Sequence, residues 1–355
     1  MIKTNILSEQ EANIVETFEQ VHRLILQGLK DGAYPSAALA VGIGDKTYRK
    51  QTYGDCTEDT LFDMASLSKI LGPTMIALRF LEEGRFRLYD TVADFFPHAP
   101  ADKKCITILQ LMTHCSGIPA HFFLSDYISD PAEAAQAILD HPLAQAPGGD
   151  PIYSCMGYIL LGKILEKISG LSLDELAEQY VFAPLGMKNT GYHPAGPCAP
   201  TELDPTTGKL LCGVVHDENA RFLQGISANA GVFSDLNDMI TFVKMLSLGG
   251  NGYLSPATLN AAIRNRTPNS KGEFRGLGFN LAGSEKNFLG DLVSPRAYGH
   301  TGFTGTSIAI DPETGLWMVL LTNRVCPTRS NLKLSRIRCL AHNAAAAEAS
   351  RLTHK

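Results

Sequence analysis

The chain is organised around residues 61–74, which read Leu61-Phe-Asp-Met-Ala-Ser66-Leu-Ser-Lys69-Ile-Leu-Gly-Pro-Thr74. An extended apolar segment leads into a small residue, then a serine, and then a lysine three positions later. If Ser66 opens a helix, Lys69 lies one turn later on the same face, within reach of the serine oxygen. A neutral lysine can take the proton of the serine if burial and the helix N-terminus lower its pKa. The stretch therefore predicts a nucleophile, Ser66, and its base, Lys69.

A single Ser-x-x-Lys pattern is weak evidence, because the chain contains a second copy. Ser330-Asn-Leu-Lys333 stands in a polar stretch before an alanine-rich tail, and it is typical of the N-cap region of a surface helix. The same interpretation, an N-cap followed by a solvated lysine, stays open for Ser66 until partners are found elsewhere in the chain.

Composition limits the class of protein. The chain has 355 residues, of which 45% are hydrophobic and 19% charged, with a net charge of -5, and these values are typical of a soluble enzyme. The charges are not clustered, so we expect a small-molecule substrate and neither a nucleic-acid nor a membrane partner. The first ten residues contain no apolar run that would form a signal peptide. We therefore expect a cytoplasmic protein; the sequence does not define its oligomeric state.

The cysteines and the absent motifs narrow the chemistry. No two of the eight cysteines form a Cys-x-x-Cys pair, so free, mostly buried thiols are expected. The sequence contains no His-Glu-x-x-His, no Gly-x-x-x-x-Gly-Lys-Ser/Thr and no Gly-x-Ser-x-Gly. Metalloprotease, P-loop and α/β-hydrolase interpretations lose their main support, and no metal or cofactor is expected.

Hydrophobic periodicity places strands at both ends of the chain and helices in the middle. It predicts a helix over 11–30 and a final helix over 332–351. Segments of period two, which indicate strands, are 37–44, 47–53, 277–281, 306–310 and 316–322. We therefore expect an α+β fold, in which an antiparallel sheet is flanked by the N- and C-terminal helices and an all-helical domain is inserted.

The expected boundaries follow from this order. Residues 1–75 and 225–355 are assigned to the sheet domain, and residues 76–224 to the mostly helical inserted domain. Within the insert, residues 187–224 are rich in proline and turn residues and are expected to form a loop. The helix that starts at Ser66 is expected to bend at Gly72-Pro73. The active site is expected in the cleft between the two domains.

Two further stretches are expected to reach that cleft. The first, Gly148-Gly-Asp-Pro-Ile-Tyr153-Ser-Cys155-Met-Gly-Tyr158, runs from a loop into a helix. The second, Tyr298-Gly-His300-Thr-Gly302-Phe303-Thr-Gly305, leads into a strand, and its glycines permit close approach to the backbone. The order Ser-x-x-Lys, then Tyr, then His-Thr-Gly is much less probable by chance than any one part.

With these stretches in place, the chain resembles the serine β-lactamase and penicillin-binding-protein family from about residue 15 to about residue 345. The resemblance is to the class C-like branch, which contains esterases, D-Ala carboxypeptidases and muropeptide amidases. It implies a β-lactamase/transpeptidase-like fold and a serine hydrolase that forms a covalent acyl-enzyme. Supporting segments are Leu111-Met-Thr-His-Cys-Ser-Gly-Ile118, Pro184-Leu-Gly-Met187, Val215-His-Asp-Glu-Asn-Ala220, Asn229-Ala-Gly-Val-Phe-Ser234 and Leu321-Thr-Asn-Arg-Val325.

The resemblance also implies roles for single residues. Ser66 matches the acylated nucleophile, Lys69 its base, and Tyr153 a second proton carrier that serves the leaving group and the deacylating water. The strand motif, usually Lys-Thr-Gly in the family, is matched by the substrate-binding residues His300, Thr301 and Gly302. The backbone N–H groups of Ser66 and Phe303 would form the oxyanion hole.

Two positions depart from the family pattern, and both are expected to bind substrate. The position two residues after Tyr153 is usually Asn or Asp but is Cys155 here, and a thiol is a poor hydrogen-bond partner. We favour a tolerated small side chain over a redox switch or second nucleophile, and with a neutral Lys69 we expect an ordinary thiol facing the cleft. Asn229 stands where related amidases tend to carry histidine, which predicts a shifted substrate preference.

Three other features have less specific interpretations. His114 is expected to be a structural histidine at a helix end rather than an acid or base. His216-Asp217 is about equally compatible with a substrate-facing pair and with a loop anchor. Arg324, which follows the last strand, is expected to pair with a carboxylate of the substrate or of the protein. A non-catalytic relative that is acylated without turnover, a penicillin-binding or sensory protein, remains the alternative function, and Cys155 is the feature that favours it.

Overall fold

A six-stranded antiparallel sheet forms the base of the molecule in the computed structural model, which describes residues 17–284 and 287–353. The strand order is β2-β1-β8-β7-β6-β5, so strands from the two ends of the chain pair at β1 and β8. Within the described residues, no helix combines the length and hydrophobicity needed to cross a membrane. The strands are β1 (Ser36–Ile43), β2 (Lys46–Gly54), β5 (Asn280–Leu281), β6 (Tyr298–Thr301), β7 (Ser307–Asp311) and β8 (Leu316–Thr322).

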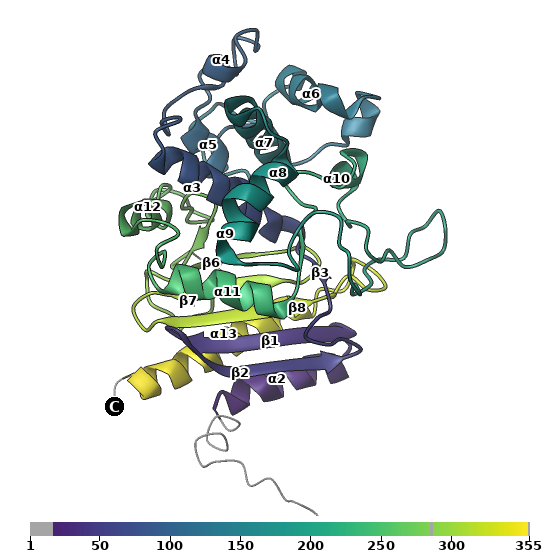
Figure 1. The fold of residues 1–355 in the computed structure, drawn as a ribbon, viewed down its shortest axis with the longest axis vertical. Coiled ribbons are helices and arrows are strands. Elements are labelled where there is room, and N and C mark those ends of the chain that lie inside the picture. The colour runs from purple at the N-terminus through teal and green to yellow at the C-terminus, as the bar shows by residue number, and fades with distance from the viewer. Residues whose placement is uncertain (1–16, 285–286, 354–355) are drawn as a thin grey trace, which may run out of the picture.

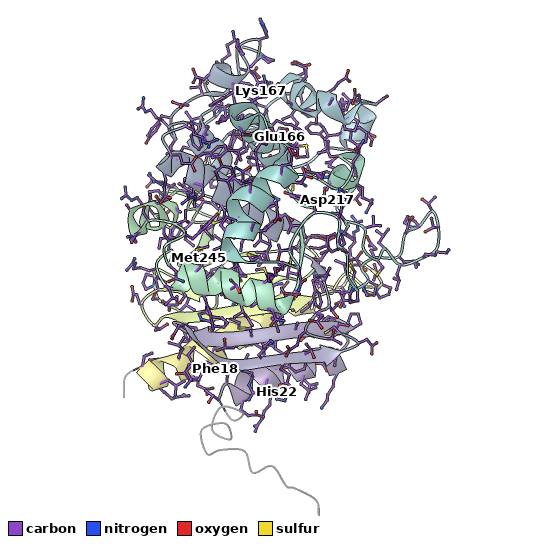
Figure 2. All side chains as sticks on the ribbon, viewed as in Figure 1. Phe18, His22, Glu166, Lys167, Asp217 and Met245 are labelled. Atoms are coloured by element: carbon purple, nitrogen blue, oxygen red, sulfur yellow. The ribbon has the colours of Figure 1, made fainter. Side chains whose placement is uncertain are left out.

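Helices cover both faces of this sheet. The helices α2 (Glu19–Lys30) and α13 (Leu334–Thr353) lie side by side on one face, and α11 (Leu236–Ser247) lies on the other (Figure 1). The residues of β1 alternate between the two cores: Leu39 packs with the terminal helices, and Ala40 packs on the side of α11. His22 of α2 lies on the outer face of the sheet (Figure 2). It hydrogen-bonds the hydroxyl of Tyr53 at 2.9 Å.

The remaining helices gather beyond α11, on the same side of the sheet (Figure 1). Their core is continuous with that face of the sheet, because one cluster of buried side chains contains residues of β1, α3 and α7. These helices are α3 (Met75–Glu82), α4 (Val92–Phe95), α5 (Ile108–Met112), α6 (Ala134–Asp140), α7 (Cys155–Ser169), α8 (Leu173–Ala177), α9 (Ala183–Leu185), α10 (Glu218–Phe222) and α12 (Pro256–Ala262).

The α+β architecture expected from the sequence is confirmed: an antiparallel sheet, packed terminal helices and a helical insert. The boundaries at residues 75 and 225 stay a prediction. The start of the N-terminal helix, which was expected at residue 11, falls partly outside the described residues, and α2 begins at Glu19. The predicted loop over 187–224 is wrong at one point, because Asp217 caps the short helix α10 with its side chain.

The segment that carries Ser66 differs most from the prediction of one bent helix. A two-stranded ribbon of β3 (Phe62–Asp63) and β4 (Phe233–Ser234) leads into a 3₁₀ turn, η1 (Ala65–Leu67). A π-helical turn, η2 (Ile70–Thr74), follows and contains Pro73, and the α-helical part begins only at α3. Proline has no N–H to donate, and a widened turn is a common way to accommodate this near functional sites.

The structure also corrects two strand predictions in the C-terminal half of the chain. The strand expected over 277–281 is reduced to the two residues of β5. The stretch from Tyr298 to Gly305 does not run straight into the next strand; it forms β6, then a turn, and then β7 pairs back against it. This turn, residues 302–306, is where the sheet approaches Ser66.

Close packing of β1 against β8 predicts a sensitive position at Gly42. A methyl group there would collide with the buried indole of Trp317 and with the carbonyl oxygen of Lys46. We expect Gly42→Ala to lower the free energy of unfolding by about 1–3 kcal/mol in chemical denaturation. Gly191→Ala is the control, because its methyl group would enter open space. Equal stability of the two variants would contradict this account of the sheet.

Candidate active site

A cleft of about 350 Å³ opens where η1, the loop before α7 and the end of β6 meet. The structure therefore brings together the three sequence stretches from which the site was predicted. The predicted residues that line the cleft are Ser66, Tyr153, His300, Thr301, Gly302, Phe303 and Arg324.

Ser66 stands in a tight turn that the sheet holds from one side. The residue before it, Ala65, has a φ of 46°, a left-handed conformation that is uncommon for a residue with a side chain. On the sheet side, a Cβ on Gly302 would collide with the carbonyl oxygen of Met64. Only glycine at 302 lets the β6–β7 turn lie against the backbone of the Ser66 turn.

Lys69 is completely buried and lies directly behind Ser66. Its Nζ donates to the carbonyl oxygen of Asn229 at 2.9 Å, to the Oγ of Ser66 at 3.2 Å and to the Sγ of Cys155 at 3.5 Å. These acceptors come from three separate segments of the chain. The alternative of a solvated Lys69 is excluded by this burial.

The charge of Lys69 differs from the sequence expectation. Burial lowers the pKa of this lysine, but Cys155 and Tyr153 beside it raise it by more, and the pKa ends above its usual value. The direction of this shift disagrees with the neutral Lys69 expected from the sequence, because the neighbouring Cys155 and Tyr153 favour the ammonium. In the resting state this ammonium donates a hydrogen bond to the Ser66 oxygen and cannot take the serine proton. A different group near Ser66 must therefore act as the proton acceptor.

Tyr153, which lines the same cleft as Ser66, is the candidate for that acceptor. Its ring centroid lies 4.9 Å from Lys69 Nζ and 5.2 Å from the Cζ of Arg275, so two cations face the ring. Its ring packs on His114 at 4.5 Å between centroids. The Tyr153 hydroxyl is buried and makes no hydrogen bond of normal geometry among the described residues, although it interacts with the nearby Lys69 ammonium. A buried polar group without such a hydrogen bond at a cleft is available to a substrate or to Ser66.

Two neutral histidines flank the tyrosine. His114 accepts the N–H of Ser154 with its Nδ1 at 3.0 Å, and the Nδ1–H of His300 donates to the Thr301 carbonyl oxygen at 2.9 Å. Burial lowers the pKa of both rings well below the usual value, and the nearby Arg275 contributes. His114 therefore has the structural role expected of it, and His300 presents an uncharged Nε2 in place of the lysine usual in the strand motif.

The oxyanion-hole prediction concerns two backbone N–H groups. Neither the N–H of Ser66 nor that of Phe303 donates to an acceptor in the described part of the chain. Both residues line the same cleft. The structure therefore leaves these two donors free to bind an oxyanion.

Cys155 and Asn229 do not line the cleft. Cys155 is the first residue of α7 and touches the catalytic group through Lys69. The side chain of Asn229 is buried and accepts from the Ser227 hydroxyl at 2.6 Å, so only its carbonyl faces Lys69. Their geometry supports anchoring of Lys69 rather than the substrate contact expected from the sequence.

Two arginines that the sequence analysis did not single out also line the cleft. Arg275 is buried and pairs with Glu273. Arg338 of α13 donates to the Gly305 carbonyl oxygen at 3.0 Å, and burial lowers its pKa to about 10, so it stays charged at neutral pH. Among the described residues no carboxylate lies within 4 Å of Arg338 or Arg324. No local sequence signal marks either residue, because each reaches the cleft only through the tertiary fold.

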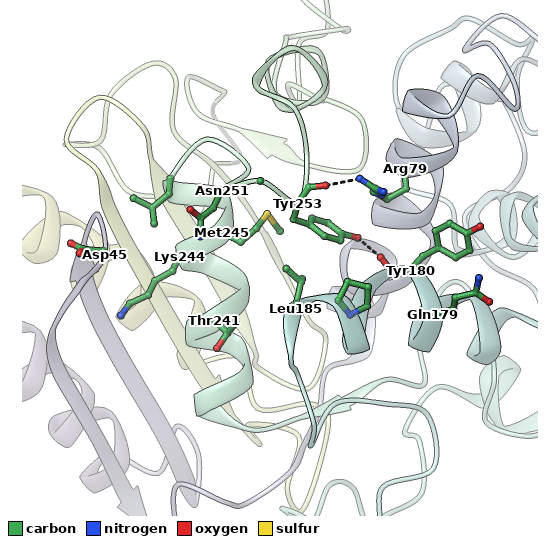
Figure 3. A pocket seen from close by; sticks show the side chains of 13 residues that line it. Asp45, Arg79, Gln179, Tyr180, Leu185, Thr241, Lys244, Met245, Asn251 and Tyr253 are labelled. Atoms are coloured by element: carbon green, nitrogen blue, oxygen red, sulfur yellow. Dashed lines mark hydrogen bonds between the residues drawn. The ribbon is translucent and has the colours of Figure 1, made fainter.

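A larger cavity of about 900 Å³ lies elsewhere, between α11, α9 and the end of α3 (Figure 3). Two of its polar groups are already paired: Arg79 donates to the Tyr253 carbonyl oxygen, and the Tyr253 hydroxyl donates to the Tyr180 carbonyl oxygen, both at 2.8 Å. Ser66 and its neighbours do not line this cavity. The chemistry is therefore assigned to the smaller cleft.

Comparisons with known proteins agree with this geometry. Residues 21–341 match the family model described as Beta-lactamase. A protein of Escherichia coli (strain K12) described as "Putative D-alanyl-D-alanine carboxypeptidase" is 30% identical over 361 residues, covering 87% of this chain and 83% of that protein. A similarly described protein of Salmonella typhimurium is 29% identical over 372 residues and covers 89% and 85%.

Solved structures share the fold at lower sequence identity. "EstCE1, a hydrolase with promiscuous acyltransferase activity" superposes with a TM-score of 0.73 at 20% identity, covering 96% of this chain and 100% of that one. The octameric penicillin-binding protein homologue from Pyrococcus abyssi gives a TM-score of 0.71 at 22% identity and covers 88% and 74%. At these sequence identities, the two structural similarities show a shared fold.

The contact between Lys69 and Ser66 predicts a large effect of removing the lysine. In Lys69→Ala the serine loses its donor and the buried positive charge, so the rate of labelling by a fluorophosphonate probe should fall about 10²–10⁴-fold. Lys333→Ala is the matched control, because it removes the lysine of the second Ser-x-x-Lys, whose Nζ binds only the Asp31 carbonyl on the surface. Labelling of Lys69→Ala at the wild-type rate would refute the assignment.

Proposed function

This chain belongs to the beta-lactamase family, and from that premise we propose that it is a serine hydrolase acting through a covalent acyl-enzyme. Its substrate is an ester or amide of a small amino-acyl or muropeptide-like compound. The observation that carries the proposal is the contact of the buried Lys69 with Ser66, beside a buried Tyr153 hydroxyl that makes no hydrogen bond of normal geometry in the part of the chain that the structure describes. Nucleophile, cation and proton acceptor thus lie around one cleft.

In the proposed acylation step, Ser66 Oγ attacks the substrate carbonyl while its proton passes to the oxygen of Tyr153. In this proposal Tyr153 enters the step as the phenolate, its own proton having gone to solvent, and the Lys69 ammonium stabilises that anion. The N–H groups of Ser66 and Phe303 bind the oxyanion, each contributing about 3 kcal/mol in comparable sites. When the intermediate collapses, Tyr153 gives the proton to the leaving group, and a Ser66 ester remains.

Deacylation follows the same path with water as nucleophile. Tyr153 takes a proton from the water as the water attacks the acyl carbon, and the proton then returns to Ser66 when the ester bond breaks. The enzyme ends the cycle unchanged, and the acid is released. The neutral His300 Nε2 is an acceptor for an N–H or O–H of the substrate.

The arginines of the cleft support a substrate with a negative group. Arg324 and Arg338 have no carboxylate partner among the described residues, and Arg338 is charged although it is 8% exposed. Guanidinium groups bind carboxylates with directed hydrogen bonds. The relatives described as D-alanyl-D-alanine carboxypeptidases are named for a substrate that ends in a carboxylate. We therefore favour a peptide-like substrate with a free carboxylate.

The alternative is a protein that is acylated but does not turn over, such as a penicillin-binding or sensory homologue. Cys155 favours this alternative, because its thiol holds Lys69 more weakly than an amide or carboxylate oxygen would. A slow deacylation step would then leave the acyl-Ser66 trapped.

The two functions differ in their time course with p-nitrophenyl butyrate. For the hydrolase we expect continuous release of nitrophenol, with turnover of at least about 1 s⁻¹ as for ordinary enzymes. The rival predicts a burst of one equivalent and a stable mass increase on Ser66. Intact-protein mass spectrometry during the reaction distinguishes them, and Lys333→Ala, which leaves the cleft intact, should behave as wild type in either case.

The arginines predict a preference for a free carboxylate. We expect N-acetyl-D-alanyl-D-alanine to be hydrolysed with a kcat/KM about 10–100-fold above that of its C-terminal amide, as one charge-assisted pair would give. Arg324→Gln should reduce this ratio. Arg23→Gln is the control and should leave it unchanged, because Arg23 is an exposed residue of α2 that does not line the cleft. Equal use of acid and amide by the wild type would exclude this substrate class.

A further inference from the structure

Asp63 has no part in the proposed chemistry, yet it is one of the few buried carboxylates near the cleft. It is the last residue of β3 and is 2% exposed. One carboxylate oxygen accepts the N–H of Ala65 at 2.8 Å, and the other accepts the N–H of His216 at 2.6 Å. The first bond fixes the peptide that joins Met64 to Ala65, one residue before Ser66.

The main chain of the same residue holds the opposite wall of the cleft. The hydroxyl of Thr304 donates to the carbonyl oxygen of Asp63 at 2.6 Å, and that of Thr306 donates to the next carbonyl, Met64, at 3.1 Å. Thr304 follows Phe303, so this bond fixes the turn that carries the second candidate oxyanion donor. Through its carboxylate and its carbonyl oxygen, Asp63 is bonded to both segments that carry the candidate oxyanion donors.

The bond from His216 extends this control to the side chain of Phe303. The imidazole of His216 stacks on the Phe303 ring at 5.6 Å between centroids and an interplanar angle of 28°. Its Nε2 is held by Glu202 at 3.0 Å. The position of this ring therefore depends on the loop that Asp63 anchors, and His216-Asp217 acts as a loop anchor rather than a substrate-facing pair.

We infer that Asp63 is a positioning residue that aligns the N–H groups of Ser66 and Phe303 as one oxyanion hole. This inference rests on the proposed acyl-enzyme function and adds the group that sets its geometry. Burial raises the pKa of Asp63, although the two N–H bonds oppose the shift. Keeping this buried group ionised therefore costs free energy. An amide in its place would turn a donor toward one of the two backbone N–H groups.

The test compares an oxoester with the thionoester of the same acyl and leaving groups. A developing thiolate-like sulfur is larger and a weaker acceptor than an oxyanion, so an aligned hole favours the oxoester. For the wild type we expect an oxoester-to-thionoester ratio of kcat/KM on the order of 10², as one well-placed donor would give. In Asp63→Asn the ratio should fall at least about 10-fold, through kcat rather than KM.

Two further variants separate alignment from stability. Thr304→Val removes only the hydroxyl that holds the Asp63 carbonyl and keeps the shape of the side chain, and it should lower the ratio in the same direction. Asp311→Asn is the matched control: this buried carboxylate accepts the N–H of Ser294 at 2.8 Å, and it lies about 13 Å along β7 from the end nearest the cleft. It should lose stability and keep the wild-type ratio.

The outcomes are distinct. A folded Asp63→Asn or Thr304→Val enzyme with the wild-type ratio would overturn the inference and leave the proposed function intact. If Asp63→Asn does not fold, Thr304→Val alone decides. If the ratio fell equally in Asp311→Asn, a general loss of stability would explain the effect, and the inference would also be overturned. Failure of the wild type to form any acyl-enzyme would remove the proposed function, and the inference with it.

Discussion

The buried ammonium of Lys69 is the group on which the arrangement of the cleft depends. An uncompensated charge in the interior is too costly to persist, so an ammonium without exposure to water requires acceptors within hydrogen-bond distance. Those acceptors come from η1, from the first residue of α7 and from the segment before β4. The hydrogen bonds to this one cation therefore hold the Ser66 turn, helix α7 and the segment before β4 in fixed positions relative to one another.

The sheet contributes a second constraint, which is close backbone approach. Gly302 lets the β6–β7 turn lie against the Met64 carbonyl, and the hydroxyls of Thr304 and Thr306 bond the same short segment. The left-handed Ala65 is held between these contacts and the Asp63 carboxylate. A strained backbone conformation of this kind persists only where several surrounding contacts each enforce it. A nucleophile on such a turn is held in place before any substrate arrives.

Much of the fold was predictable from the sequence because it depends on local patterns. Period-two segments gave β1, β2, β7 and β8, and the order of strands and helices gave the inserted architecture. The motif residues Ser66, Lys69, Tyr153 and His300 do meet around one cleft. The turn types around Ser66 were not predictable, because a 3₁₀ and a π turn in succession are imposed by tertiary contacts on a sequence with ordinary helical spacing.

The charge state of Lys69 was also beyond the sequence, since its acceptors lie 86 and 160 residues away along the chain. The two departures from the family pattern, Cys155 and Asn229, are the residues that supply these two acceptors. At position 229 the contact to Lys69 is made by the main-chain carbonyl, which every residue type provides, so Asn can stand there without loss of the anchor. At position 155 the contact is made by a side chain, and the sulfur accepts at the longest of the three distances. The Asn229 carbonyl makes the shortest of the three contacts, so Lys69 keeps one anchor that does not depend on the side chain at position 155 or 229.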